Sequence, residues 1–174
     1  MTELRLRSRL ARLSRHDLAL LLRAFGVLLW VRLNLFLHRT PYLRGKIAQL
    51  AARAPLDPAP AAADLREVVW SVRNAARFVP VGSCLTQALA GQYLLAARGA
   101  ETTVRLSMPI AGTDQAPAFR PHAWLMSGRM ILLGGTPEEL ARHRALVEFH
   151  PDRPDAGVPV SSIGAPFGTE APPS

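Results

Sequence analysis

The only cysteine of the chain, Cys84, lies where the sequence predicts the start of a helix. Ser83 before it is a residue type that caps helix N-termini, and apolar residues recur at helical spacing from Leu85 to Leu95. The unpaired N–H groups and the positive dipole end of such a helix stabilise a thiolate, which is the reacting form of cysteine. They can also bind the oxyanion that forms when a carbonyl is attacked. The pattern therefore favours acyl chemistry at Cys84.

A base for this nucleophile is available at His122. It stands at the start of a predicted strand, after the chain has changed from helical to alternating periodicity. A plainer interpretation competes at each position: Cys84 could be an inert core thiol, and His122 a capping group beside a packed Trp124. The other four histidines are expected to be solvated or to serve in packing: His16, His38, His143 and His150.

The elements expected around this pair change from helices to strands along the chain. Helices are predicted from Leu18 to Leu37, Leu43 to Arg53, Asp64 to Ala76 and Leu85 to Leu95. Strands are predicted from Thr102 to Met108, His122 to Met126 and Arg129 to Leu133, with a hairpin turn at Ser127-Gly128 and a short helix afterwards from Pro137 to Phe149. We therefore expect an α+β fold in which the cysteine helix packs on a small antiparallel sheet that presents His122.

The length and composition suit one compact domain with appendages. The chain has 174 residues, 49% of them hydrophobic, which suffices for one buried core. We expect a helical region with an alanine and proline linker at 1–60, the catalytic domain at 61–150 and a proline-rich flexible tail at 151–174. The N-terminal helices carry more apolar surface than such a domain easily buries, so we expect them to contact a partner through Leu20, Leu28, Trp30, Leu33 and Phe36.

The chain is strongly basic, with a net charge of +8. Such a balance favours an acidic partner, whether an acidic peptide, nucleic acid or an anionic membrane surface, and no nucleic-acid-binding motif accompanies it. The segment Leu18 to Leu37 is interrupted by Arg23 and Arg32, and a central arginine costs about 3 kcal/mol in a bilayer. We interpret it as a buried or interfacial helix. A signal peptide is also disfavoured, because the stretch contains Arg23 and no small-residue cleavage site follows before Pro41, and the single cysteine predicts a cytoplasmic protein.

Several short motifs occur in the order found in one enzyme family. They are Gly82-Ser83-Cys84-Leu85, Ala88-Leu89, Leu94-Leu95 before Arg98-Gly99, the strand Val104-Arg105-Leu106, and Pro121-His122-Ala123-Trp124 followed by Gly128. In this the chain resembles the transglutaminase-like, papain-like cysteine peptidases that remove the leader from lasso peptide precursors. The resemblance implies a papain-like core in which Cys84 is the nucleophile, His122 the general base and Trp124 the aromatic that accompanies the histidine.

The resemblance also implies a set of partners. These are a ribosomally made precursor peptide as substrate, a small leader-recognition protein and the ATP-dependent macrolactam synthetase that receives the core peptide. It implies no metal or organic cofactor and no specific nucleic acid, and a single cysteine also excludes an internal disulfide or a multi-cysteine zinc site. The basic N-terminal helices could in addition contact a membrane surface.

The third catalytic residue of the family is not matched. An aspartate usually follows the histidine on the next strand and orients the imidazole, whereas that stretch here reads Ile131-Leu132-Leu133-Gly134-Gly135. Four substitutes remain open at this stage: a backbone carbonyl, Asp114, Glu138 or Glu139. Loss of an orienting acid lowers the rate more often than it abolishes the chemistry.

Two further functions remain open besides peptide hydrolysis. The same pair, Cys84 and His122, could pass the acyl group to an amine instead of water, as transglutaminases and arylamine acetyltransferases do. The chain could also be a non-catalytic module whose arginine-rich N-terminus binds nucleic acid or a membrane. Product mass separates hydrolysis from transfer, and binding that survives Cys84→Ala would indicate the module.

Overall fold

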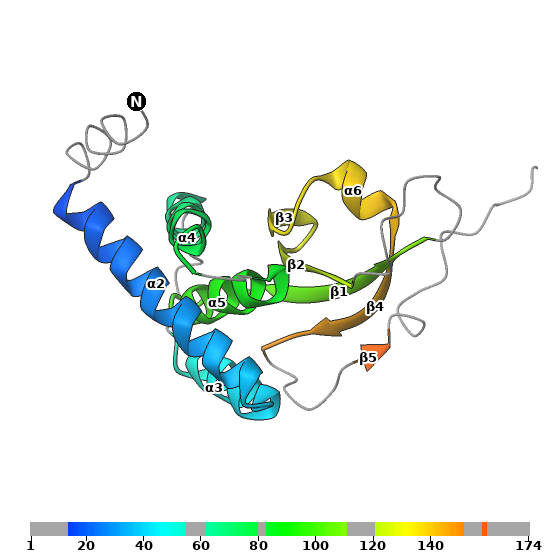
Figure 1. Ribbon diagram of the computed structural model, residues 1–174, viewed down its shortest axis with the longest axis horizontal. Coiled ribbons are helices and arrows are strands. Elements are labelled where there is room, and N and C mark those ends of the chain that lie inside the picture. Colours follow the sequence, from blue (N-terminus) through cyan, green and yellow to red (C-terminus); the bar gives the residue numbers. More distant parts are fainter. Residues whose placement is uncertain (1–13, 55–61, 80–82, 111–120, 152–157, 160–174) are drawn as a thin grey trace, which may run out of the picture.

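The computed structural model describes residues 14–54, 62–79, 83–110, 121–151 and 158–159. Helices precede strands along most of the chain, as the sequence predicts (Figure 1). The elements in chain order are α2 (Arg15–Phe36), α3 (Thr40–Arg53), α4 (Ala62–Ala76), α5 (Cys84–Ala96), β1 (Thr103–Pro109), β2 (His122–Ser127), β3 (Met130–Leu133), α6 (Pro137–Ala141), β4 (His143–Phe149) and β5 (Val158–Pro159).

The strands form one antiparallel sheet in the order β3-β2-β1-β4-β5. β1 lies at the centre, where it pairs with β2 on one side and β4 on the other. α5 packs against β1, β2 and β3, and its Gly91 leaves room for the side chains of Leu125 and Leu133. The predicted α+β fold, with the cysteine helix on an antiparallel sheet, is thereby confirmed.

Three helices, α2, α3 and α4, pack around α5 on the side away from the sheet (Figure 1). α2 begins with a capping box, in which Ser14 Oγ accepts from the Asp17 N–H at 3.0 Å and the Asp17 carboxylate accepts from the Ser14 N–H at 2.9 Å. Its face toward α4 and α5 buries Ala24, Leu28 and Val31 in the same core as the cysteine helix. α2 is therefore tied to the domain along one face.

Three sequence predictions are wrong in detail. The stretch Pro137–Phe149 is not one helix: α6 ends at Ala141, and His143–Phe149 forms β4, because β1 has an open edge on that side for a strand to pair with. The helix predicted from Asp64 starts earlier, at Ala62, and has Asp64 in its first turn. The helix predicted from Leu43 also starts earlier, at Thr40, with Pro41 in its first turn, a position that proline tolerates.

The three-part division of the chain remains a prediction, because much of its linker and tail lies outside the described residues. Within the tail, Val158–Pro159 forms β5 and pairs with β4. Within the N-terminal part, α2 and α3 contribute side chains to the same hydrophobic core as α5, among them Leu43 and Ile47 of α3.

Candidate active site

Cys84 is the first residue of α5, as the sequence predicts. Ser83 caps the helix, because its Oγ accepts from the Thr86 N–H at 3.2 Å. The N–H groups of the first turn have no acceptor within the helix, so those of Cys84 and Leu85 are donors aimed out of the helix end. Cys84 itself is partly buried, and its Sγ accepts a hydrogen bond from the Ala123 N–H at 3.4 Å. The thiol therefore lies against the start of β2.

His122 is the first residue of β2 and precedes the residue that contacts the thiol. Its Nε2 is hydrogen-bonded to the backbone carbonyl of Gly134. A carbonyl oxygen only accepts, so Nε2 carries the proton and donates it. In the neutral imidazole Nδ1 is then the nitrogen with a free lone pair. The carbonyl of Gly134 thus selects the tautomer in which Nδ1 can act as a base.

The backbone around Gly134 requires glycine. Gly134 has φ +117°, and a Cβ there would lie 2.7 Å from the Ala123 carbonyl oxygen and 2.9 Å from Trp124 Cα. Gly135 has φ +146°, and a Cβ there would lie 2.9 Å from Trp124 Cζ3. Both angles fall where L side chains are strained. The two glycines allow the chain to pass close to β2 and present a carbonyl to His122.

Among the substitutes for the family's aspartate that lie in the described residues, the backbone carbonyl is the one that contacts His122. Glu139 is bound elsewhere, since its carboxylate accepts from the Thr136 N–H at 2.8 Å in the capping box of α6. Glu138 is exposed in the first turn of the same helix, where its own backbone N–H, and after it the Thr136 side chain, lower the pKa of its carboxyl group. Asp114 lies outside the described residues.

Trp124 packs against the ring of His122. It is fully buried, its Nε1–H donates to Ser107 Oγ at 2.7 Å, and its ring meets His122 edge-on at 4.5 Å between centroids. Ser107 is the residue of β1 that pairs with His122 in the strand register. The ring of Trp124 therefore restricts where the imidazole can lie.

Sequence reasoning missed His143. Its ring centroid lies 5.8 Å from that of His122 and 5.6 Å from that of Trp124, and its Nδ1 bonds to the Glu139 carbonyl at 2.7 Å. No local signal indicated this, because the contact depends on His143 starting a strand that pairs with β1. The remaining histidines lie elsewhere: His16 beside Glu67, His38 exposed after α2, and His150 beside Thr103 and Glu148.

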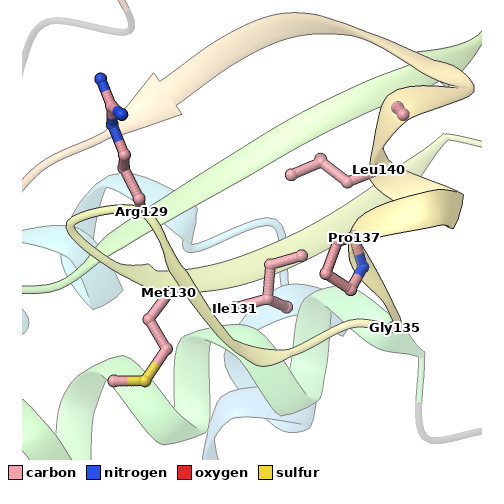
Figure 2. A pocket seen from close by; sticks show the side chains of 7 residues that line it. Arg129, Met130, Ile131, Gly135, Pro137 and Leu140 are labelled. Atoms are coloured by element: carbon pink, nitrogen blue, oxygen red, sulfur yellow. The ribbon is translucent and has the colours of Figure 1, made fainter.

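Two cavities flank the edge strand β3, and neither is lined by Cys84 or His122. One of about 480 Å³ lies between β3 and α6, with Ile131, Pro137 and Leu140 around it and Arg129 extending away (Figure 2). The other, of about 540 Å³, lies between β3 and α4 and is lined by Arg66, Arg73, Arg77 and Trp70 among others. Within the described residues, no group of histidines, cysteines and carboxylates could hold a metal ion.

A cysteine at a helix N-terminus against a strand that begins with a histidine defines a thiol and imidazole site suited to acyl chemistry. The chain belongs to the transglutaminase-like superfamily, whose profile matches residues 27–148. This superfamily includes cysteine peptidases and transferases. No match was found among curated proteins or among solved structures.

Proposed function

We propose that this protein is a cysteine peptidase that removes the leader from a ribosomally synthesised precursor peptide during lasso peptide maturation in the cytoplasm. The observation that carries the proposal is the placement of Cys84 Sγ against the Ala123 N–H, next to a histidine whose tautomer is fixed by the Gly134 carbonyl. Superfamily membership and the order of the motifs from Gly82 to Gly128 support it.

The steps follow from the two side chains. Nδ1 of His122 takes the thiol proton, and the Cys84 thiolate attacks the scissile carbonyl carbon. The oxyanion is stabilised by N–H groups at the start of α5. His122 returns the proton to the leaving amine as the C–N bond breaks, leaving a thioester on Cys84. Water, deprotonated by the same Nδ1, hydrolyses the thioester and restores the thiol.

The lining of the cavity between α4 and β3 is an argument for a peptide substrate with acidic residues. Its lining includes the guanidinium groups of Arg66, Arg73 and Arg77, and none of the described residues that line it is acidic. Arg73 also donates to the Leu132 carbonyl at 3.3 Å, two residues before the carbonyl that binds His122. A peptide lying there would run beside β3, the strand that leads to Gly134, whose carbonyl binds His122.

Acyl transfer to an amine is the second candidate. It is favoured by membership of a superfamily that includes transferases, and it uses the same thioester on Cys84. The two functions differ in the last step, because an amine in place of water leaves the acyl group joined to a new nitrogen. A product heavier than the hydrolysed peptide by the mass of the amine, less one water, would establish transfer.

The test is mass spectrometry of a candidate precursor incubated with the protein and its leader-recognition partner. Leader loss with the wild type and none with Cys84→Ala or His122→Gln would support the peptidase. Full cleavage by Cys84→Ala would exclude it. Equal absence of cleavage in wild type and variant, together with salt-sensitive nucleic-acid binding by both, would favour a basic binding module.

The single cysteine permits a test that needs no substrate. Cys84 is the only thiol of the chain and thiolates react with iodoacetamide far faster than other side chains, so the first alkylation seen by intact mass reports its rate. We expect His122→Gln to slow alkylation at neutral pH, because the base that accepts the thiol proton is gone. His150→Gln is the matched control, since His150 lies beside Thr103 rather than at the thiol. Equal rates for all three proteins would show that His122 does not act on Cys84.

A further inference from the structure

The outer face of α2 is apolar although it faces solvent. Large exposed side chains on this helix include Leu22 at 63% and Phe36 at 77% exposure, and four more leucines are between 44% and 54% exposed: Leu18, Leu29, Leu33 and Leu37. Figure 1 shows α2 at the outer side of the helical layer, with α4, α5 and α3 on its inner side. Half of the exposed large apolar side chains among the described residues therefore lie on or just after this one helix.

These side chains form one continuous stripe, which we call the α2 stripe. Residues 18, 22, 26, 29, 33 and 36 follow one another at intervals of three or four, so they lie on one helix face. Gly26, in the middle, is exposed with no atom within 4 Å of where its Cβ would be. A surface helix of a globular protein presents polar residues on this face, whereas a helix apolar all round is buried or in contact with lipid.

Arginines border the stripe on both sides. Residues 23 and 32 lie about 105° and about 75° to either side of its centre at 100° per residue, and Arg15 lies at its N-terminal end. Among the described residues no carboxylate forms an ion pair with Arg23 or Arg32. Across residues 14–54 there are seven lysines and arginines and one carboxylate, Asp17. Apolar side chains flanked by arginines match the acyl and headgroup layers of an anionic bilayer.

The contacts of α2 favour a position in the plane of the bilayer surface. By length and composition α2 is the one helix in the described ranges that could cross a membrane. Its inner face, however, is committed to the domain core through Ala24, Leu28 and Val31. A spanning orientation would remove these residues from α4 and α5. A helix lying flat buries the stripe and keeps the core intact.

Charge argues against a second copy of the chain as the occupant. Pairing two α2 stripes would bring Arg15, Arg23 and Arg32 of both copies together without intervening carboxylates, and like charges repel across an interface. The stripe also has no hydrogen-bonding side chain between Leu18 and Leu37 on its own face, so it offers a protein partner apolar contact alone. Apolar contact alone is sufficient for a helix face to insert into the acyl boundary of a lipid bilayer.

We propose that the α2 stripe docks the protein peripherally on an anionic lipid bilayer, with the leucines and Phe36 in the acyl boundary and Arg23 and Arg32 at the headgroups. This inference is independent of the chemistry at Cys84, and Cys84→Ala should bind lipid as the wild type does. It gives the basic N-terminal region a defined partner: a negatively charged membrane surface.

Vesicle cosedimentation tests the proposal, using full-length protein with vesicles of phosphatidylcholine alone and of phosphatidylcholine mixed equally with phosphatidylglycerol. We expect binding to the mixed vesicles and at least tenfold weaker binding to the neutral ones. The triple variant Leu22→Gln, Leu29→Gln, Leu33→Gln should lose at least tenfold in affinity for mixed vesicles. Glutamine keeps helix propensity, and circular dichroism checks that α2 is retained.

Two control variants distinguish binding through the α2 stripe from nonspecific apolar adsorption and measure the contribution of the arginines. Phe78→Gln with Leu146→Gln removes two exposed apolar side chains outside α2 and should leave binding unchanged. Arg23→Gln with Arg32→Gln should weaken binding to the mixed vesicles by about tenfold and leave the neutral vesicles unaffected. The proposal is overturned if the triple variant binds as the wild type does, or if neither vesicle binds the wild type. It is also overturned if the triple variant turns a dimer into a monomer in light scattering, which would assign the stripe to a second copy.

Discussion

The backbone carbonyl of Gly134 accepts a hydrogen bond from the Nε2–H of His122. It occupies the position in which the leader peptidases that this chain resembles usually have an aspartate. A carbonyl fixes the tautomer as a carboxylate does, but it carries no full charge to stabilise an imidazolium. Its position depends on backbone conformation, because Gly134 and Gly135 both have positive φ and both approach Trp124. The orienting group is therefore sensitive to substitution at glycine rather than at an acid.

Gly134→Ala should lower cleavage of the precursor on the order of 10- to 100-fold, since an added Cβ meets the Ala123 carbonyl oxygen and moves the group that orients His122. The strain should also destabilise the fold by roughly 1–3 kcal/mol. Gly128→Ala is the matched control. Gly128 has φ +54° with nothing within 4 Å of the Cβ position, so it should lose stability through backbone strain and keep its activity. Equal activities of the two variants would contradict a role for the Gly134 carbonyl.

The hydrogen bond from Trp124 to Ser107 should be visible in a double-mutant cycle. Trp124→Phe leaves the fully buried Ser107 Oγ without its donor, and Ser107→Ala leaves the indole N–H without its acceptor. Each single change should cost roughly 1–3 kcal/mol in urea unfolding. The double variant should cost clearly less than the sum, because no buried polar group is then left unpaired. Strict additivity would show that the two side chains do not depend on each other.

The parts of the site fixed by local sequence were predictable. Ser83 and Cys84 mark a helix start through a cap and a 3.6-residue period, and His122 marks a strand start through alternation, both visible within a few neighbours. The hairpin at Gly128 follows from a residue type that tolerates positive φ. These features require no knowledge of what lies across the sheet.

The parts that depend on strand register were not predictable. The Gly134-Gly135 sequence indicated only that the family's aspartate is missing, because the Gly134 carbonyl reaches His122 through the pairing of β2 with β3. His143 approaches His122 only because β4 pairs with β1, and this pairing also ends at Ala141 the helix that was predicted to run from Pro137 to Phe149. The sequence allowed a backbone carbonyl as the orienting group but did not indicate which residue supplies it.

The packing of α5 on the sheet predicts opposite effects at two helical glycines. A Cβ at Gly91 would lie 2.6 Å from Leu125 Cδ2 and 2.9 Å from Leu133 Cδ1, both in the core. Gly91→Ala should therefore destabilise by about 1–3 kcal/mol and lower activity by shifting the helix that bears Cys84. Gly45→Ala in α3 meets nothing within 4 Å and should stabilise by up to about 1 kcal/mol in the same urea titrations. If both Gly91→Ala and Gly45→Ala increased the free energy of unfolding, α5 would be able to shift on the sheet without losing stability.

The capping box of α2 predicts a stability change in acid. The Ser14 backbone N–H, and after it the Ser14 side chain, hold the pKa of Asp17 below its ordinary value of 3.8. A carboxyl whose pKa is lowered by folding stabilises the folded state above that ordinary value, and the contribution is lost as pH falls through the folded pKa. Asp17→Asn should thus be less stable than the wild type at neutral pH and equal to it at about pH 2, as measured by urea unfolding followed through helical circular dichroism. A difference that persists undiminished in acid would mean that the charge of Asp17 does not contribute to the cap.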